Sequence, residues 1–194
     1  MKKYQEKTFE LGGLEGLSEK QITEHIKLYS GYVKNVNKLS EDIERLSEDE
    51  VNAIAVSELR RRFGFEFNGM RLHEYYFEAL GAPQQLGEVS DLRKALTSQF
   101  GSFEDWATEF KKFGMMRGAG WVILYNDPMS GNLLNAWITD HELGHLAGLP
   151  VILAMDVWEH AFLIDFLPSQ RKEYIETFFK NLRWDTIESR FTNP

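Results

Sequence analysis

The stretch GWVILYNDPMSGNLLNAWI, from Gly120 to Ile138, decides the fold class of this chain. It contains two apolar runs separated by the turn-forming residues Asn126-Asp127-Pro128 and Ser130-Gly131. Two such runs joined by a short turn are typical of a β-hairpin. The sequence before Gly120 has the periodicity of helices, so we predict an α+β fold and not an all-helical one.

Upstream of the hairpin, apolar residues recur every three or four positions, as on the buried face of a helix. Ser18-Glu19-Lys20-Gln21 forms a capping box that predicts the start of a first long helix. Ser47-Glu48-Asp49-Glu50 resembles the cap of a second, which Gly64 and Gly69 interrupt and Gly81-Ala82-Pro83 ends. The first buried stripe is predicted to contain Ile22, His25, Ile26, Tyr29, Tyr32, Val33 and Val36, and the second Phe63, Phe67, Met70, His73, Phe77 and Leu80.

The rest of the chain predicts shorter elements. Helices are expected from Ser90 and from Ser102, and an apolar run after Pro150 suits a buried strand ending at Asp156. The segments WEHAFLIDFL (158–167), RKEYIETFFKNL (171–182) and WDTIESRF (184–191) suit further helices. We therefore expect a long-helix hairpin in residues 1–84, packed on a C-terminal lobe, residues 85–194, with an antiparallel sheet and helices.

The composition excludes several classes of protein. The chain has 194 residues, 43% of them hydrophobic and 27% charged, which is ordinary for a globular protein. It has no cysteine, so any metal must be held by histidines and carboxylates. A net charge of -8 argues against nucleic acid as a partner. No apolar run could span a bilayer and no apolar signal core is present, so we expect no membrane partner and a cytoplasmic location.

The pattern HELGH, from His141 to His145, matches the zinc-peptidase signature H-E-x-x-H. Such a site needs both histidines on one face of a sustained helix. Here Gly144 and Gly148 follow a predicted strand and Pro150 stops any helix, so the context is poor. The alternative is a loop between strands with ordinary polar side chains at Glu142 and His145, and we favour that interpretation over a zinc-dependent hydrolase.

A second group of histidines points to a different metal site. His25 and His73 lie on the buried stripes of the two long helices, where a lone histidine is more often a hydrogen-bonded core residue. Asp156 ends an apolar strand, and His160 follows four residues later. Three imidazoles and one carboxylate would suit manganese, iron, cobalt or zinc with open positions for other ligands. Tyr32, two helical turns after His25, would lie beside such a site, or be a simple core tyrosine.

At this point the chain resembles the iron/manganese superoxide dismutase family. The most specific match is DVWEHAF, from Asp156 to Phe162, against the family pattern D-x-W-E-H-A-[YF]. Further matches lie in the family's order along the chain: HIKLYSGYVKNVN, FNGMRLHEYYFEAL, FGSFEDWATEF, GAGWVILY and RKEYI followed by WDTIESRF. The resemblance implies a helical hairpin plus a lobe with a three-stranded antiparallel sheet, with the metal site between the two.

The resemblance also implies roles for individual residues. Four residues match the ligands of one iron or manganese ion: His25, His73, Asp156 and His160. Tyr32 matches a gateway tyrosine, and His141 a residue that hydrogen-bonds metal-bound solvent. The site would be enclosed by Trp121, Trp158 and Tyr76. Glu159 matches a glutamate that reaches the ligand histidine of the partner subunit in a homodimer or a dimer of dimers. The implied activity is the conversion of superoxide to O2 and H2O2.

The chain departs from the family pattern in three places. The spacing from His25 to Tyr32 is one residue shorter than usual, which predicts a regular first helix or a bulge displaced elsewhere. A histidine and a tyrosine that usually pair across the dimer interface are replaced by Leu28 and Leu163. Because superoxide is an anion and this chain is acidic, we expect local positive charge at the entrance, with Lys27 and Arg171 as candidates. A metal-stabilised relative with little activity stays an alternative.

Overall fold

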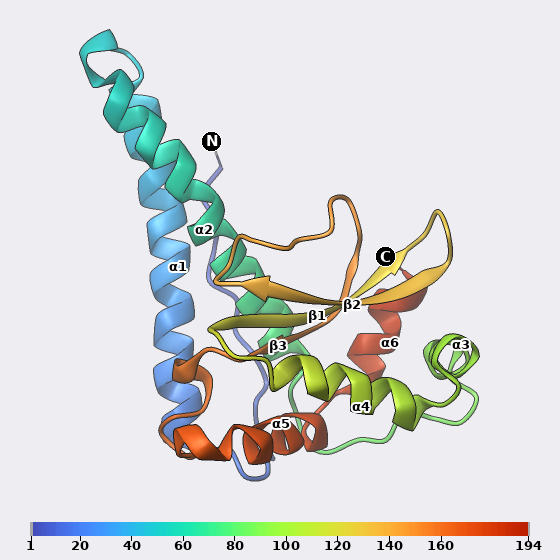
Figure 1. The fold of residues 1–194 in the computed structure, drawn as a ribbon. Helices are drawn as coiled ribbons and strands as arrows, with labels where there is room; N and C mark the ends of the chain where they lie inside the picture. The colour runs from blue at the N-terminus through green and yellow to red at the C-terminus, as the bar shows by residue number, and fades with distance from the viewer. Residues whose placement is uncertain (1, 194) are drawn as a thin grey trace.

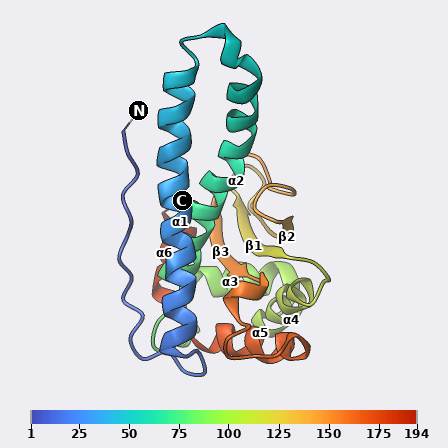
Figure 2. The ribbon, with the colours of Figure 1, turned by 90° about the vertical axis from the view of Figure 1, so that its left-hand side faces the viewer.

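The two long helices form an antiparallel hairpin in the computed structural model, which describes residues 2–193. Helix α1 spans Glu19–Leu46 and α2 spans Ala53–Glu78, joined by the short helix η1 at Glu50–Asn52 (Figures 1 and 2). The side chain of Ser18 caps α1 by accepting from Gln21 N, as predicted. The predicted cap of α2 is wrong: Ser47 ends α1, and Asp49 caps η1 instead.

Both helices are regular. Helix α1 is α-helical throughout, as the spacing from His25 to Tyr32 predicts. Gly64 and Gly69 leave α2 unbroken. At Gly69 the two helices approach closely, because a Cβ there would lie 2.6 Å from Tyr32 Cδ1. The absence of a side chain at Gly69 therefore leaves room for the Tyr32 ring between the helices.

The sheet has three antiparallel strands, with β1 in the centre. Strands β1 (Gly120–Asp127) and β2 (Asn132–Thr139) form the predicted hairpin, and β3 (Val151–Asp156) is the predicted buried strand. In the register Trp121 lies opposite Asp156, so the start of β1 and the end of β3 meet. Helix α2 packs against β3, which brings His73 to that end of the sheet.

Four shorter helices complete the C-terminal lobe (Figure 1). Helices α3 (Asp91–Phe100) and α4 (Phe103–Gly114) are capped by Ser90 and Ser102, as predicted. Helices α5 (Arg171–Lys180) and α6 (Trp184–Thr192) also lie where predicted, and α5 follows the short helix η3 (Pro168–Gln170). The fold class is therefore the predicted α+β, whereas the division into residues 1–84 and 85–194 stays a prediction.

The predicted helix over residues 158–167 is wrong. The structure has only the short helix η2 at Glu159–Ala161, followed by turns. The side-chain amide of Gln21 donates to the His160 carbonyl at 2.7 Å and accepts from Ile164 N at 3.0 Å. These are the two backbone groups that an α-helix would pair with each other. Gln21 thus replaces a helical hydrogen bond and fastens this segment to α1.

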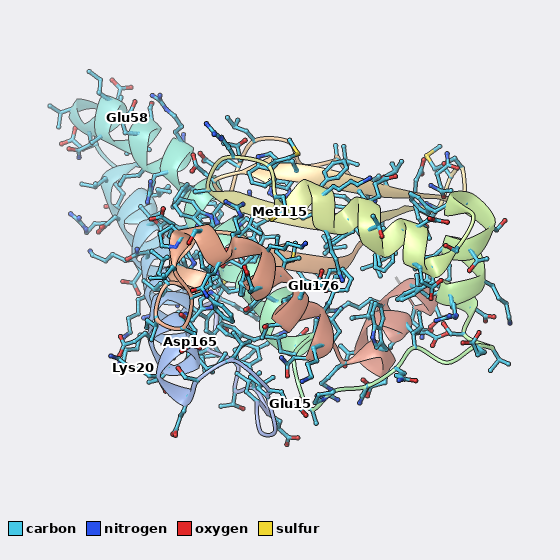
Figure 3. All side chains as sticks on the ribbon, turned by 60° about the horizontal axis from the view of Figure 1, so that its bottom comes forward. Glu15, Lys20, Glu58, Met115, Asp165 and Glu176 are labelled. Carbon is cyan, nitrogen blue, oxygen red and sulfur yellow. The ribbon has the colours of Figure 1, made fainter. Side chains whose placement is uncertain are left out.

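Surface contacts hold the remaining parts to this core. The segment before α1 runs beside that helix (Figure 2), where Lys7 N donates to Tyr29 Oη at 2.9 Å. Asp165 lies by the first turn of α1 (Figure 3) and accepts from Ser18 N. Within residues 2–193, no helix combines the length and the apolar character needed to cross a bilayer.

Candidate metal centre

Four side chains converge where α1, α2, β3 and η2 meet. His25, His73, Asp156 and His160 each place a potential ligand atom within 4.8 Å of those of the other three. Asp156 Oδ2 lies 3.1 Å from His25 Nε2, 3.0 Å from His160 Nε2 and 3.6 Å from His73 Nε2. Three imidazole nitrogens therefore surround one carboxylate oxygen, and these four groups could hold one metal ion.

Hydrogen bonds from outside orient two of these groups. Asp156 Oδ1 accepts from Trp158 N at 2.8 Å, and the Tyr174 hydroxyl donates to the Asp156 carbonyl at 2.7 Å. Together they direct Oδ2 toward the histidines. His73 Nδ1 lies 2.6 Å from the carbonyl oxygen of Gly69. A carbonyl only accepts, so Nδ1 carries the proton and Nε2 keeps its lone pair.

The donor set fits a metal cation. His73 Nε2 is buried without a hydrogen-bond partner, and its lone pair faces the Asp156 carboxylate. Two acceptors facing each other in a buried site repel unless a cation lies between them. His25 Nδ1 is also buried without a partner. Nitrogen and oxygen donors of this kind suit iron, manganese, cobalt or zinc.

The protonation states agree with metal binding. Burial lowers the pKa of His25 and holds that of His73 well below its ordinary value. Burial opposes the ionisation of Asp156, but the neighbouring His160 and His25 hold its carboxyl pKa below the ordinary value. The two helix histidines are therefore neutral and Asp156 is charged near neutral pH, as ligands must be.

A buried hydrogen-bonded chain of three residues lies next to the four groups. Trp121 Nε1 lies 2.9 Å from His141 Nδ1, and Tyr32 Oη lies 2.7 Å from His141 Nε2. An indole N–H can only donate, so Nδ1 accepts and the proton of the neutral ring is on Nε2. Burial lowers the pKa of His141 to about 4, which keeps the ring neutral. His141 therefore donates to the Tyr32 hydroxyl.

This geometry bears on the role that the resemblance implies for His141. Both ring nitrogens are taken, one by Trp121 and the other by Tyr32. The contacts thus connect His141 to the rest of the site through Tyr32, and the implied hydrogen bond from His141 to metal-bound solvent stays a prediction.

Aromatic rings enclose the site. The Trp121 ring lies 5.1 Å from His73, the Tyr76 ring 5.0 Å from His25, and Trp158 stacks on both His141 and His160. Phe65, which sequence reasoning missed, lies 4.6 Å from His141. Glu159 is exposed at the surface next to His160. The side chains of His25, His73 and Asp156 are fully buried, whereas that of His160 is 21% exposed.

The HELGH residues lie in the loop between β2 and β3, not on a helix. His145 Nδ1 hydrogen-bonds Tyr125 Oη and its Nε2 hydrogen-bonds the His141 carbonyl. The ring nitrogens of both histidines are therefore engaged with protein atoms. This agrees with the loop interpretation and gives no support to a zinc-dependent hydrolase.

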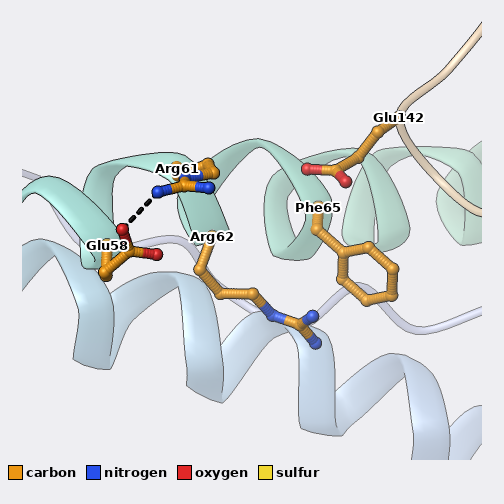
Figure 4. Close-up of a pocket in the computed structure, with 5 residues that line it drawn as sticks. All are labelled: Glu58, Arg61, Arg62, Phe65 and Glu142. Carbon is orange, nitrogen blue, oxygen red and sulfur yellow. Dashed lines mark hydrogen bonds and ion pairs between the residues drawn. The ribbon is translucent and has the colours of Figure 1, made fainter.

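The two expected entrance cations differ in their contacts. Lys27 pairs with Glu24, which offsets its charge. Arg171 donates to the carbonyls of Gly114 and Gly118, which hold the guanidinium in place without offsetting its charge. A third cation, Arg62, was missed: its guanidinium lies 3.8 Å from the centre of the Phe65 ring. Figure 4 shows Arg62 and Phe65 in one surface pocket with Glu142 of the loop. Arg62 also pairs with Glu66, which offsets its charge.

The fold and the donor set together define a class, namely α+β proteins that hold one transition-metal ion between a helical hairpin and a small sheet. Residues 88–190 match the profile of iron/manganese superoxide dismutases, C-terminal domain. The chain belongs to the iron/manganese superoxide dismutase family, as the sequence motifs indicate.

Curated relatives match over almost the whole chain. An iron superoxide dismutase of Cupriavidus metallidurans is 35% identical over 181 residues, covering 92% of this chain and 90% of the relative. One of Aquifex aeolicus is 34% identical over 185 residues, covering 92% and 85%. A manganese superoxide dismutase of Mycolicibacterium smegmatis is 29% identical over 190 residues, covering 94% and 89%.

Proposed function

We propose that this protein is a superoxide dismutase that uses one iron or manganese ion per chain. The observation that carries the proposal is the buried group of three histidines and one aspartate, in a chain of this family. A bound ion supplies reversible one-electron chemistry, which lets one superoxide ion be oxidised to O2 and a second be reduced, with two protons, to H2O2.

The four converging residues would be the ligands. His25, His73 and His160 offer imidazole nitrogen donors, and Asp156 offers one carboxylate oxygen. Trp121 and Tyr76 exclude water from the buried side, since both are fully buried against the histidines. If a second copy of the chain covers the open side of His160, entry of a small anion is restricted to the side on which Tyr32 and His141 lie.

Tyr32 is the residue we assign to proton delivery. Its oxygen accepts from His141, so its own O–H remains free to donate toward an anion in the site. Burial raises the pKa of the Tyr32 hydroxyl, so it holds its proton near neutral pH. His141 would stabilise the oxygen whenever that proton is given away, because its N–H already points there.

The active form we propose is a homodimer, with a dimer of dimers as the larger alternative. Three apolar side chains are exposed: Leu28 on α1 at 42%, and Leu163 at 40% and Ile164 at 42%, which follow His160 by three and four residues. Gln21 fastens the segment with Leu163 to α1, which carries Leu28. A second copy would cover this surface and the open side of His160, and Glu159 would reach His160 of the partner subunit.

A cytoplasmic location is part of the same proposal. The chain has no cysteine and so gains nothing from an oxidising compartment. Cell fractionation with an antibody against the protein would test this directly.

The experiment that tests the function is elemental analysis of the protein as isolated, paired with a superoxide assay after loading with each metal. We expect iron or manganese near one ion per chain and turnover with at least one of them. Bound metal without turnover would favour a metal-stabilised relative, and zinc with peptidase activity a hydrolase. His73→Ala should lose the metal, whereas His141→Ala should retain it.

A further inference from the structure

His145 lies in the loop after β2 and uses both of its ring nitrogens. Its Nε2 lies 3.0 Å from the carbonyl oxygen of His141, which can only accept, so Nε2 carries a proton. Its Nδ1 lies 2.9 Å from Tyr125 Oη on β1 and accepts a hydrogen bond from that hydroxyl. The two partners therefore fix both the tautomer and the orientation of the His145 ring.

The His141 carbonyl is held from a second side as well. Asn68 on α2 donates its side-chain N–H to the same oxygen at 2.7 Å. One carbonyl oxygen thus joins the helical hairpin, through Asn68, to the sheet, through His145 and Tyr125. A carbonyl oxygen has two lone pairs, so these two donors satisfy it.

The backbone on either side of His141 includes two residues with positive φ. Asp140 has a φ of 52° and is the one non-glycine residue between residues 2 and 193 with a positive φ. Gly144 has a φ of 110°, and a Cβ there would lie 2.5 Å from the carbonyl oxygen of Trp137. Such a backbone persists only where its surroundings hold it in place. The donors on the His141 carbonyl are two of those constraints.

We propose that His145 is a positioning residue of this site, which fixes the His141 backbone so that the His141 ring can connect Trp121 to Tyr32. The inference rests on the proposed function for its effect on turnover, but not for its geometry. Loss of the His145 donor frees one side of the loop, and the 2.7 Å contact between His141 Nε2 and Tyr32 Oη lengthens. Proton delivery from Tyr32 then slows.

Two substitutions of similar size separate the contacts of His145. In His145→Gln the side-chain amide reaches about as far as Nε2 and keeps a donor for the His141 carbonyl. In His145→Asn the shorter amide reaches only the position of Nδ1, so it keeps a partner for Tyr125 and loses the carbonyl. A purely structural role at the Tyr125 contact would make His145→Gln the more harmful change.

The experiment compares both variants with the parent protein, all loaded with the same metal. We expect His145→Asn to lower turnover by up to roughly a hundredfold, the loss that a displaced catalytic group can cause. Metal content should stay unchanged and the solvent deuterium isotope effect on turnover should rise. His145→Gln should recover most of the turnover and the parent isotope effect. Equal turnover and isotope effects in the two variants would overturn the proposal.

A second measurement does not depend on dismutase activity. Hydrogen exchange of the backbone amides in residues 140–146 should be faster in His145→Asn than in His145→Gln and the parent. If these amides exchange alike in all three proteins, His145 does not hold the loop, whatever the activity. If exchange differs but the parent has no dismutase activity, the proposed function fails and the positioning of the loop stands.

Discussion

His141 is hydrogen-bonded through both ring nitrogens and through its backbone carbonyl. Its ring nitrogens are hydrogen-bonded to Trp121 and Tyr32, and its carbonyl oxygen to Asn68 and His145. These contacts require a neutral ring, because Trp121 donates to Nδ1 and a protonated ring would present an N–H there. Protonation of the ring would therefore break the hydrogen bond from Trp121.

The first prediction concerns the stability of the metal-free protein in acid. Burial lowers the pKa of His141 from 6.5 to about 4, so between these pH values the unfolded chain binds the extra proton. The unfolding free energy should be constant above pH 6.5, fall as pH drops through this window and level off for this group below about 4. Buried His25 and His73 act in the same direction.

Thermal unfolding of the metal-free protein at pH 7 and pH 5 checks the prediction. His141→Gln cannot take up a proton and should lose part of the difference between the two pH values. The same pH dependence in parent and variant would show that His141 makes no contribution.

The second prediction tests Tyr32 as the proton donor. Tyr32→Phe should keep the fold and the metal because the ring remains. It should lower turnover because the Tyr32 hydroxyl, which hydrogen-bonds His141, is lost. Tyr29→Phe is the matched control, because Tyr29 lies one turn earlier on α1 and bonds Lys7 N and Glu74 instead. The control should cost about 1–3 kcal/mol of stability without a change in turnover. Unchanged turnover in Tyr32→Phe would make Tyr32 an ordinary core tyrosine.

At the scale of elements, the site depends on how closely α1 and α2 approach. Gly69 lies under the Tyr32 ring, and its carbonyl accepts a hydrogen bond from His73 Nδ1. Gln21, at the start of α1, likewise positions the segment that contains His160. Its side-chain amide bonds the His160 carbonyl and Ile164 N, which would pair with each other in a helix. Each helix therefore positions a group of the site through one residue that is neither aromatic nor charged.

The third prediction uses the glycines of the two helices. Gly69→Ala should lower both stability and turnover, because the new Cβ would lie 2.6 Å from Tyr32 Cδ1 and push the ring away from His141. Gly31→Ala is the control, since a Cβ there has no atom within 4 Å. It should stabilise α1 by up to about 1 kcal/mol, the propensity difference between glycine and alanine. Denaturant unfolding and the superoxide assay check both; equal effects would contradict the close approach.

At the scale of the whole molecule, we propose that the open side of the metal centre and the exposed leucines belong to one interface between two copies of the chain. Leu28 and Leu163 are each about two-fifths exposed, and His160 is the ligand candidate that solvent reaches. Apolar side chains grouped at a functional site are typical of an interface. With leucine at both positions, the proposed interface would bury no unsatisfied hydroxyl or imidazole there.

The fourth prediction is that Leu163→Glu converts the proposed dimer into monomers of 22.6 kDa. Two buried carboxylates facing each other across a symmetric interface would destabilise it strongly. Val89→Glu, at a residue that is 83% exposed in the C-terminal lobe, should leave the assembly unchanged. Sedimentation velocity distinguishes the two; a dimer that survives Leu163→Glu would have its interface elsewhere.

Apolar periodicity, helix caps and turn-forming residues made most of the fold predictable. The cap at Ser18, the turn at Asn126–Gly131 and the apolar run after Pro150 mark elements found where expected. The helix over residues 158–167 was not predictable in detail, because the amide of Gln21, far away in the sequence, takes two of its backbone groups. Phe65 and Arg62 were missed because nothing local marks them as neighbours of His141.

The sequence by itself determined which residues could hold a metal, since histidine on a buried helical stripe and aspartate after an apolar strand are chemically unusual wherever they lie. It also determined that HELGH lies outside a sustained helix, because glycine and proline act through the local backbone. Only the tertiary structure decided what HELGH does instead. His141 joins Trp121 to Tyr32, and His145 holds its carbonyl, because hydrogen-bond partners from β1, α1 and α2 meet there. Those partners are brought together by packing across the whole chain, which no local pattern encodes.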